Sequence, residues 1–255
     1  MYDPDNFRLD GQTALVTGGG AGIGRGISLM FAGAGANVLV TDLHQETAEA
    51  VAAEIRKAGG NAVGLACNVT KEEDLAAAVE AAITHFGKLS ILVNNAGGGG
   101  PKPFDMPMDD FRWAYEINLF SLFRLTQLAV PHMAKVGGGA VLNISSMAGE
   151  NKNMRMASYS SSKAAVNHLT RNIAFDLGAM NIRVNAIAPG AIRTDALATV
   201  LTPEIEQVML KHTPIKRLGQ PEDIAHAALF LCAPASVWVS GQVLTVSGGG
   251  VQELD

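Results

Sequence analysis

The sequence predicts one α/β domain, a doubly wound parallel sheet with helices on both faces. Short, largely apolar segments of β-strand type alternate with longer helical segments along the whole chain, which is the pattern of strand–helix–strand units. No Pro- or Ser-rich linker divides the 255 residues, and a chain of this length commonly forms one domain of this class. We therefore expect a single domain over residues 1–255.

Seven segments are apolar through most of their length, as strands buried on both faces of a parallel sheet are. These predicted strands are residues 13–17, 37–41, 62–67, 91–94, 140–144, 183–187 and 243–246. The predicted helices between them are residues 22–34, 45–58, 71–86, 109–135, 157–179 and 221–232. Thr70 followed by Glu73 predicts a capping box at the start of the third of these helices.

Residues 191–214 interrupt the alternation with a long insertion. It contains an apolar stripe of Leu197, Val200 and Leu201, and Thr202-Pro203 predicts the start of a helix. Because the insertion follows the carboxyl end of a strand, where open α/β sheets bind ligands, we interpret it as a lid over a substrate cleft. The alternative is a surface excursion whose apolar side packs on the body of the protein.

Composition and charge exclude several classes of protein. Hydrophobic residues make up 48% and charged residues 17% of the chain, which is typical of a globular and not of a disordered protein. The net charge is −5 and no run of Lys and Arg exceeds two residues, so we expect neither nucleic acid nor a membrane as a partner. Two cysteines and an N-terminus without an apolar signal segment indicate a cytoplasmic protein. The six histidines lack metal-ligand spacing, so no metal is expected.

A glycine-rich turn joins the first predicted strand to the first predicted helix. It has the pattern T-G-x-x-x-G-x-G over residues 17–24, in which Gly18, Gly22, Ile23 and Gly24 are the expected binding residues. Glycines allow the backbone to turn tightly and to approach a pyrophosphate, and the N–H groups at the start of the helix then face the anion. The turn therefore predicts a Rossmann-type dinucleotide site.

Asp42 predicts which dinucleotide is bound. It follows the second predicted strand, 18 residues after Gly24, and its carboxylate can accept hydrogen bonds from an adenosine ribose. The 2′-phosphate of NADP would meet a like charge there, and one pair of unit charges repels by about 4 kcal/mol at ~4 Å and an effective dielectric constant of ~20. Neither Ala21 nor Leu43 supplies a compensating basic side chain. We therefore expect NAD as the cofactor.

Tyr159 and Lys163 are four residues apart at the start of a predicted helix and so share one face of it. A free tyrosine, with a pKa of about 10, is a poor proton acceptor at neutral pH. A nearby ammonium would lower that pKa towards neutrality, where an acid–base catalyst works best. Ser146 follows the predicted strand 140–144, so its hydroxyl would hold a substrate oxygen beside the phenol, whereas Ser145 should point to the opposite face.

The order of these residues resembles that of the short-chain dehydrogenase/reductase family, over essentially the whole chain. The matching segments are Asn94-Asn95-Ala96-Gly97, Asn118, Ser146, Tyr159-x-x-x-Lys163 and Pro189-Gly190-x-x-x-Thr194. The resemblance implies a seven-stranded sheet, a homo-oligomer that is usually a tetramer or a dimer, and hydride transfer between NAD and an alcohol carbon. It implies that Tyr159 is the general acid–base and that Lys163 binds the nicotinamide ribose. Ser146 would orient the substrate, and Asn118 would hold a water in a proton relay.

The same resemblance assigns the remaining cofactor contacts. Thr194 and the backbone near Ile192 would contact the carboxamide, next to Pro189 and Gly190. Asn95 would brace the central strand, with Ala96 and Gly97 close to the adenosine ribose. Beside the adenine the family commonly has Asp-Val, where this chain has Asn68-Val69. An asparagine accepts the same hydrogen bond without charge.

Several loops resemble those of bacterial hydroxysteroid dehydrogenases within this family. They are residues 95–107, 150–153 and 239–254. The implied reaction is oxidation of the 7α-hydroxyl of a bile acid to the 7-oxo product. The expected substrate-binding residues are Gly99, Ser146, Asn151 and Tyr159, and the bile-acid carboxylate would meet Lys152, Arg155 or Arg193. The alternatives are another secondary alcohol or a 3-oxoacyl thioester as substrate, or a non-enzymatic NAD-binding protein.

Overall fold

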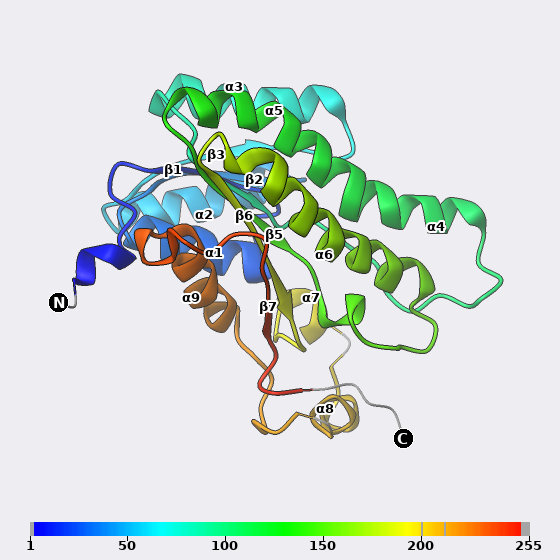
Figure 1. Ribbon diagram of the computed structural model, residues 1–255. Helices are drawn as coiled ribbons and strands as arrows, with labels where there is room; N and C mark the ends of the chain where they lie inside the picture. The colour runs from blue at the N-terminus through cyan, green and yellow to red at the C-terminus, as the bar shows by residue number, and fades with distance from the viewer. Residues whose placement is uncertain (1–2, 200, 212, 251–255) are drawn as a thin grey trace.

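Seven strands form one fully parallel sheet in the order β3-β2-β1-β4-β5-β6-β7 in the computed structural model, which describes residues 3–199, 201–211 and 213–250 (Figure 1). The strands are β1 (Thr13–Val16), β2 (Asn37–Asp42), β3 (Asn61–Ala66), β4 (Ile91–Asn94), β5 (Gly139–Ile144), β6 (Ile182–Pro189) and β7 (Val243–Val246). Each overlaps its predicted segment, so the predicted doubly wound parallel sheet is confirmed.

The helices lie on both sides of this sheet. They are α1 (Gly22–Gly33), α2 (Gln45–Lys57), α3 (Glu72–Phe86), α4 (Met108–Tyr115), α5 (Ser121–Lys135), α6 (Ala157–Gly178), α7 (Asp195–Ala198), α8 (Pro203–Leu210) and α9 (Pro221–Cys232), with the short turns η1 (Pro4–Phe7), η2 (Glu116–Phe120), η3 (Met147–Gly149) and η4 (Pro234–Ser236). Helices α1, α2 and α9 cover one face, and α3, α5 and α6 cover the other.

Alternating side chains of the central strands build two apolar cores, because successive residues of a strand point to opposite faces. Val38 and Val40 of β2 pack with Phe31 of α1 on one face. Leu39, between them, packs with the group that contains Leu75 of α3 and Leu125 of α5. All six side chains are buried. The apolar pattern of the strands therefore directs helices to both faces of the sheet.

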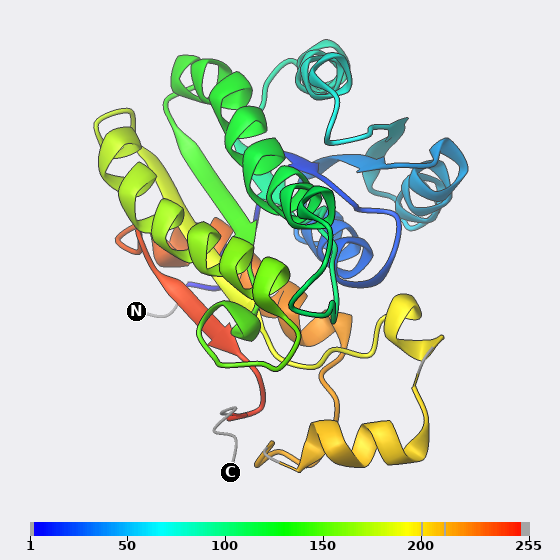
Figure 2. The same cartoon turned by 90° about the vertical axis from the view of Figure 1, so that its right-hand side faces the viewer.

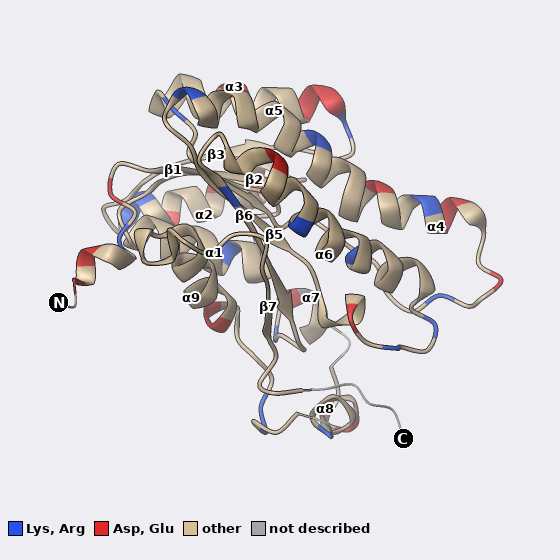
Figure 3. Cartoon of the chain, in the orientation of Figure 1, with Lys and Arg blue, Asp and Glu red and all other residues tan. Residues whose placement is uncertain are grey.

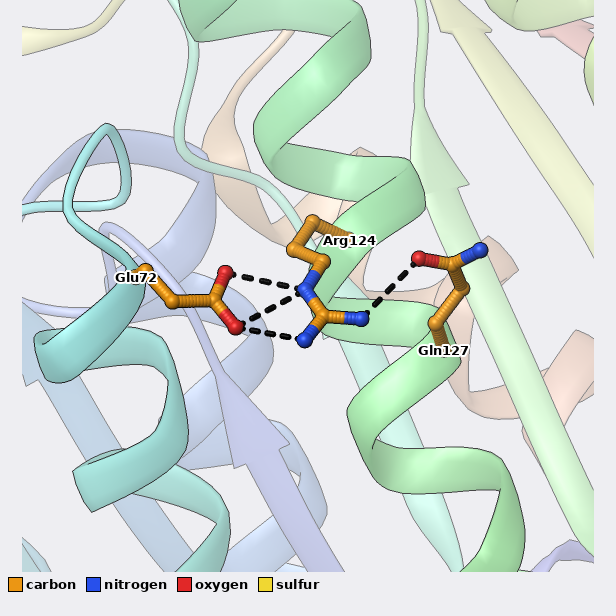
Figure 4. Close-up of polar contacts among 3 residues, drawn as sticks. All are labelled: Glu72, Arg124 and Gln127. Atoms are coloured by element: carbon orange, nitrogen blue, oxygen red, sulfur yellow. Dashed lines mark hydrogen bonds and ion pairs between the residues drawn. The ribbon is translucent and has the colours of Figure 1, made fainter.

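The predicted capping box at Thr70 and Glu73 is wrong. Helix α3 begins at Glu72, and the hydroxyl of Thr70 donates a 2.8 Å hydrogen bond to the Asn68 side chain and does not cap the helix. Glu72 instead reaches across to α5, where the guanidinium Nε of Arg124 lies 2.9 Å from both of its carboxylate oxygens (Figure 4). This ion pair lowers the pKa of Glu72 and links the ends of two helices on the same face of the sheet.

The predicted helix over residues 109–135 is interrupted near its middle. Helix α4 ends at Tyr115, the π-turn η2 spans Glu116–Phe120, and α5 continues from Ser121. A π-turn adds one residue to a helical turn and is common at functional sites. Here it contains Asn118, whose side chain is buried.

The insertion after β6 contains α7 and α8. Backbone hydrogen bonds join its first residues to Gly219, which follows the insertion in the chain. The N–H of Arg193 donates to the carbonyl of Gly219 at 2.8 Å, and the N–H of Gly219 donates to the carbonyl of Ala191 at 3.0 Å. The predicted helix start is confirmed, because the Thr202 hydroxyl accepts a 3.3 Å hydrogen bond from the N–H of Ile205. Helix α8 buries none of its residues and stands away from the sheet (Figure 2).

Basic and acidic residues are interspersed along the helices in the cartoon (Figure 3). No group of three or more His, Cys, Asp or Glu side chains suited to a metal ion occurs in the same part of the chain. None of the helices described combines the length and the apolar character needed to cross a bilayer.

Candidate active site

A cavity of about 460 Å³ opens at the carboxyl ends of the central strands, within the size range of small-molecule sites. The segments that follow β1, β4, β5 and β6 and the first turns of α6 line it. Twelve of the predicted site residues lie on its wall: Gly22, Ile23, Asn95, Gly97, Gly99, Ser146, Tyr159, Lys163, Pro189, Gly190, Ile192 and Thr194. Parallel strands present their carboxyl ends at one edge, which brings together residues far apart in the sequence.

The glycine turn forms one wall of this cavity. Gly22 has a φ of +49°, and a Cβ there would lie 3.1 Å from the methyl group of Thr194 on the opposite wall. A Cβ on Gly24 would collide with the carbonyl oxygen of Gly18, so the turn closes tightly beneath the helix start. Helix α1 begins at Gly22 without a side-chain cap, so the N–H groups of its first turn are available to an anion.

Asp42 lies at the end of β2, next to the glycine turn. Its carboxylate accepts a 3.1 Å hydrogen bond from the N–H of Gly20, and its side chain is partly exposed. One hydrogen bond leaves most of the acceptor positions of a carboxylate free for ribose hydroxyls. The following residue, Leu43, is 59% exposed and adds no charge.

Asn95 braces the two central strands where the cavity begins. Its side-chain amide donates to the carbonyls of Thr17 and Gly18 at 2.8 and 3.0 Å. The hydroxyl of Thr17 in turn accepts hydrogen bonds of 3.0 Å from the N–H groups of Asn95 and Ala96. The bracing expected of Asn95 therefore has a second half, the hydroxyl of Thr17, which the sequence reasoning missed although Thr17 begins the glycine motif.

Ser146, Tyr159 and Lys163 meet where β5 ends against the start of α6. The Lys163 ammonium donates a 2.9 Å hydrogen bond to the Ile144 carbonyl and lies 5.9 Å from the centre of the Tyr159 ring. The Ser146 hydroxyl accepts a 3.1 Å hydrogen bond from the N–H of Ala148 and also interacts with Tyr159. The Ser145 hydroxyl points to α6 and donates to the Lys163 carbonyl at 3.1 Å, so the two neighbouring serines have different partners.

Burial controls the ionisation of the tyrosine and the lysine. It raises the pKa of Tyr159, and the hydrogen bond with Ser146 opposes this only in part. Burial also lowers the pKa of Lys163 to about 8, because its ammonium loses water and faces no carboxylate. In the protein chain alone, burial therefore keeps the pKa of Tyr159 above its ordinary value, in contrast to the lowering expected from Lys163.

Asn118 connects the π-turn to the loop after β4. Its side-chain oxygen accepts a 3.0 Å hydrogen bond from the N–H of Gly98, and its amide donates to the Gly98 carbonyl at 2.8 Å. The same amide lies 3.1 Å from the hydroxyl of Ser162 on α6. Asn118 thus joins the loop to the helix that contains Tyr159 and Lys163, but it does not line the cavity.

Other predicted residues lie outside the cavity wall. The side chain of Asn68 accepts hydrogen bonds from Thr70, and Val69 is buried beside a narrow hollow that also contacts Ala96. Asn151 is half-buried and is held by a 3.0 Å bond from its N–H to the Met147 carbonyl. Val200 of the predicted apolar stripe and residues 251–254 of the tail lie outside the described residues.

The structure also separates the three cations considered for a substrate carboxylate. Arg193 is paired with Glu206 of α8 at 2.8 Å. Lys152 and Arg155 form no ion pair among the described residues, and they lie in the loop that joins Ser146 to Tyr159. Asp195, which the sequence reasoning missed, lines the cavity at the start of α7. The sequence signal that could have identified Asp195 is its position directly after Thr194, a predicted contact of the carboxamide.

Comparisons with known proteins agree with this arrangement. A family profile described as enoyl-(acyl carrier protein) reductase matches residues 18–250. The 7alpha-hydroxysteroid dehydrogenase of Escherichia coli K12 is 64% identical over 255 residues, 100% of both chains. A solved 7alpha-hydroxysteroid dehydrogenase in complex with NADH and 7-oxo glycochenodeoxycholic acid has a TM-score of 0.97 and 64% identity, with 100% of both chains covered. A short-chain type dehydrogenase/reductase from Mycobacterium marinum has a TM-score of 0.91 at 33% identity, covering 96% of this chain and 97% of that one.

We expect the Asp42→Ala substitution to narrow the preference for NADH over NADPH by at least about tenfold, since one charge repulsion accounts for up to about 4 kcal/mol. Fluorescence titration with both nucleotides measures the ratio of dissociation constants. Asp42→Asn separates the effect of the charge from the loss of the side chain, because asparagine still accepts a hydrogen bond from the Gly20 N–H and lacks only the negative charge. Equal affinity of the unsubstituted protein for both nucleotides would contradict the assignment.

The buried lysine predicts a pH-dependent stability. Folding lowers the pKa of Lys163 from 10.5 to about 8, so between these values the unfolded chain binds the proton and the folded chain does not. Its contribution to the free energy of unfolding therefore rises as the pH increases above 8. The measurement is urea unfolding of the cofactor-free protein and of the Lys163→Met variant at several pH values from 7 to 9.5. As the pH rises, the free energy of unfolding of the unsubstituted protein should increase relative to that of the variant. A difference independent of pH would show that the lysine is not desolvated.

Proposed function

Because this chain belongs to the short-chain dehydrogenase/reductase family, we propose that it is an NAD-dependent dehydrogenase that oxidises the 7α-hydroxyl group of bile acids. The observation that carries the proposal is the convergence of Ser146, Tyr159 and Lys163 on a cavity whose opposite wall is the glycine turn. The 64% identity to a 7alpha-hydroxysteroid dehydrogenase over the whole of both chains supports the choice of substrate.

The residues present fit a dinucleotide. The start of α1 has no side-chain cap, the Asp42 carboxylate has free acceptor positions, and Thr194 closes the far side of the turn. We propose that the pyrophosphate lies at the α1 N-terminus, the adenosine ribose at Asp42 and the carboxamide near Ile192 and Thr194. When bound, NAD supplies the acceptor for the hydride that leaves the alcohol carbon.

Tyr159 is the proposed general base. Its hydroxyl lies beside Ser146, so both can contact the oxygen of one alcohol. As a phenolate Tyr159 takes the alcohol proton, and Ser146 holds the alcohol oxygen in position. Burial raises the tyrosine pKa, so the phenolate needs positive charge close by. Lys163 supplies this positive charge, since its ammonium lies 5.9 Å from the centre of the Tyr159 ring. We propose that the same ammonium also binds the nicotinamide ribose.

Asn118 and the insertion complete the proposed site. Among the described residues, only the Gly98 N–H donates to the Asn118 side-chain oxygen, which leaves its other lone pair for the water of a proton relay. We propose that residues 191–214 act as the substrate lid. This is supported by the exposed apolar side chains of Ile205 and Val208 on α8, none of whose residues is buried, and by the backbone hydrogen bonds that join Ala191 and Arg193 to Gly219.

The loop cations suggest how the bile-acid carboxylate is held. Among the residues that the structure describes, Lys152 and Arg155 form no ion pair, whereas Arg193 pairs with Glu206. The Arg155 backbone, at a φ of +62°, is held by a 2.7 Å bond from the N–H of Lys102 to its carbonyl. We therefore propose that Lys152 and Arg155, and not Arg193, attract the carboxylate of the substrate.

We also propose a cytoplasmic homo-oligomer, a tetramer by family resemblance. Phe120 and Phe123 near the start of α5 are 53% and 39% exposed, and Phe175 of α6 is 91% exposed. Aromatic side chains this exposed on neighbouring helices are typical of a surface that another subunit covers. Cys67 and Cys232 are free thiols, as expected in a reducing compartment.

The main alternative is a reductase of 3-oxoacyl thioesters, the activity named for two relatives that are 35% and 39% identical over 95% of this chain. Reductases of that kind generally use NADPH, which Asp42 opposes. The test is NAD reduction, measured as NADH absorbance, with 7α-, 7β-, 3α- and 12α-hydroxylated bile acids, simple secondary alcohols and a 3-hydroxyacyl thioester in parallel. We expect activity with the 7α epimer alone. Activity restricted to simple alcohols or to 3-hydroxyacyl thioesters would refute the proposed substrate.

In the same assay, Tyr159→Phe should reduce turnover at least about 100-fold and leave NADH binding intact, because general acid–base catalysis contributes on the order of 10²–10⁴ in rate. A variant that kept full turnover would exclude Tyr159 as the base. A non-enzymatic NAD-binding protein would bind NADH and show no turnover in either form.

Neutralising the loop cations should affect binding of the charged substrate only. The double variant Lys152→Gln/Arg155→Gln should raise KM for a free bile acid up to about fivefold, as expected for exposed ion pairs, with kcat unchanged. KM for the bile-acid methyl ester should not change. Lys102→Gln is the control, because that lysine is already paired with Asp110 at 3.1 Å. An equal change for acid and ester would rule out an electrostatic role.

A further inference from the structure

A second cavity of about 450 Å³ lies at the opposite edge of the sheet, away from the proposed catalytic cavity. Its walls come from the chain before β1, from the amino-terminal ends of β4, β5 and β6, and from the segment after α9. It is as large as the catalytic cavity and shares no lining residue with it. The reaction proposed above uses no residue of this second cavity.

Arg183 of β6 contributes a positive charge to this cavity. Its side chain is partly buried, and its Nη1 donates to the carbonyls of Leu231 and Val239 at 2.7 and 3.3 Å. Burial lowers its pKa, because the cation has lost water. No carboxylate forms an ion pair with it among the described residues, and its Nε and Nη2 make no hydrogen bond there. The guanidinium therefore keeps most of its donors for another partner.

The remaining walls combine two free amides with apolar surface. The side chains of Asn6 and Gln12 line the cavity and make no hydrogen bond with the described residues. Leu9, Ile91 and Val237 supply apolar wall. A guanidinium binds a carboxylate through two parallel hydrogen bonds, and amide N–H groups add further donors to the same anion.

We propose that this cavity is a second ligand site, which binds an organic carboxylate with a short aliphatic body. The carboxylate contacts the free donors of Arg183 and the amides of Asn6 and Gln12, and the aliphatic part lies against the apolar wall. A small inorganic anion would leave that wall exposed to water, and a neutral alcohol would leave the guanidinium without a counter-charge. The ligand is therefore a carboxylate that also has an apolar part.

The test is calorimetric titration of the NADH-loaded protein with octanoate, with octanol and inorganic phosphate as comparison probes. We expect octanoate to bind at least about tenfold more tightly than either comparison probe. Gln12→Glu places a carboxylate of similar size in the cavity that Arg183 also lines, and it leaves the bonds of the arginine to the backbone in place. It should weaken octanoate binding at least about tenfold.

Two further variants make the result decisive. Arg183→Met should also weaken octanoate binding at least about tenfold, and because that variant also loses two backbone contacts, Gln12→Glu remains the primary test. Ala53→Glu is the control, since it adds the same charge at an exposed position of α2 that lines neither cavity. Octanoate binding that is absent from the unsubstituted protein would overturn the proposal. Binding that is equally strong in Gln12→Glu, as expected for a ligand in the catalytic cavity, would also overturn it.

Discussion

The hydrogen bond from the buried Lys163 ammonium to the Ile144 carbonyl positions the rest of the proposed site. An ammonium without water is costly, and here carbonyl oxygen and the aromatic face of Tyr159 replace part of its hydration. The Ser145 hydroxyl donates in the other direction, to the Lys163 carbonyl, so strand β5 and helix α6 are joined twice. This double contact sets the distance between Ser146, at the end of the strand, and Tyr159, in the first turns of the helix.

A polar chain through the otherwise apolar interior extends this constraint. The Asn94 amide donates to the Asn143 side chain at 2.9 Å, and the Asn143 amide donates to the Thr170 hydroxyl at 2.9 Å. Asn94 also reaches the hydroxyl of Thr126 on α5 at 3.2 Å. All four side chains are buried, and an unsatisfied polar group there would cost about 1–3 kcal/mol. The chain therefore ties β4, β5, α5 and α6 into one register directly beneath the cavity.

The two cavities share an electrostatic feature. Lys163 is buried and Arg183 is partly buried, both donate to backbone carbonyls, and neither pairs with a carboxylate among the described residues. For the lysine this brings the pKa down to about 8, so its charge responds to its surroundings near neutral pH. An arginine keeps its charge at any ordinary pH, which makes Arg183 a fixed cation. Burial therefore makes the charge of Lys163 sensitive to its surroundings, whereas Arg183 stays charged and is stabilised by a bound anion.

Local patterns were enough to predict the strands, the glycine turn, Asp42 and the pair Tyr159 and Lys163. Strand burial and helical spacing act over a few residues, and the carboxyl ends of parallel strands necessarily meet. The π-turn around Asn118 has no such local signature, and helix α3 begins at Glu72, one residue later than predicted, so that Lys71 and not Thr70 is its N-cap. The direction of the Tyr159 pKa and the pairing of Arg193 with Glu206 depend on burial and on neighbours distant in the sequence. Burial and ion pairing depend on which residues the fold brings together, so only the tertiary structure decides them.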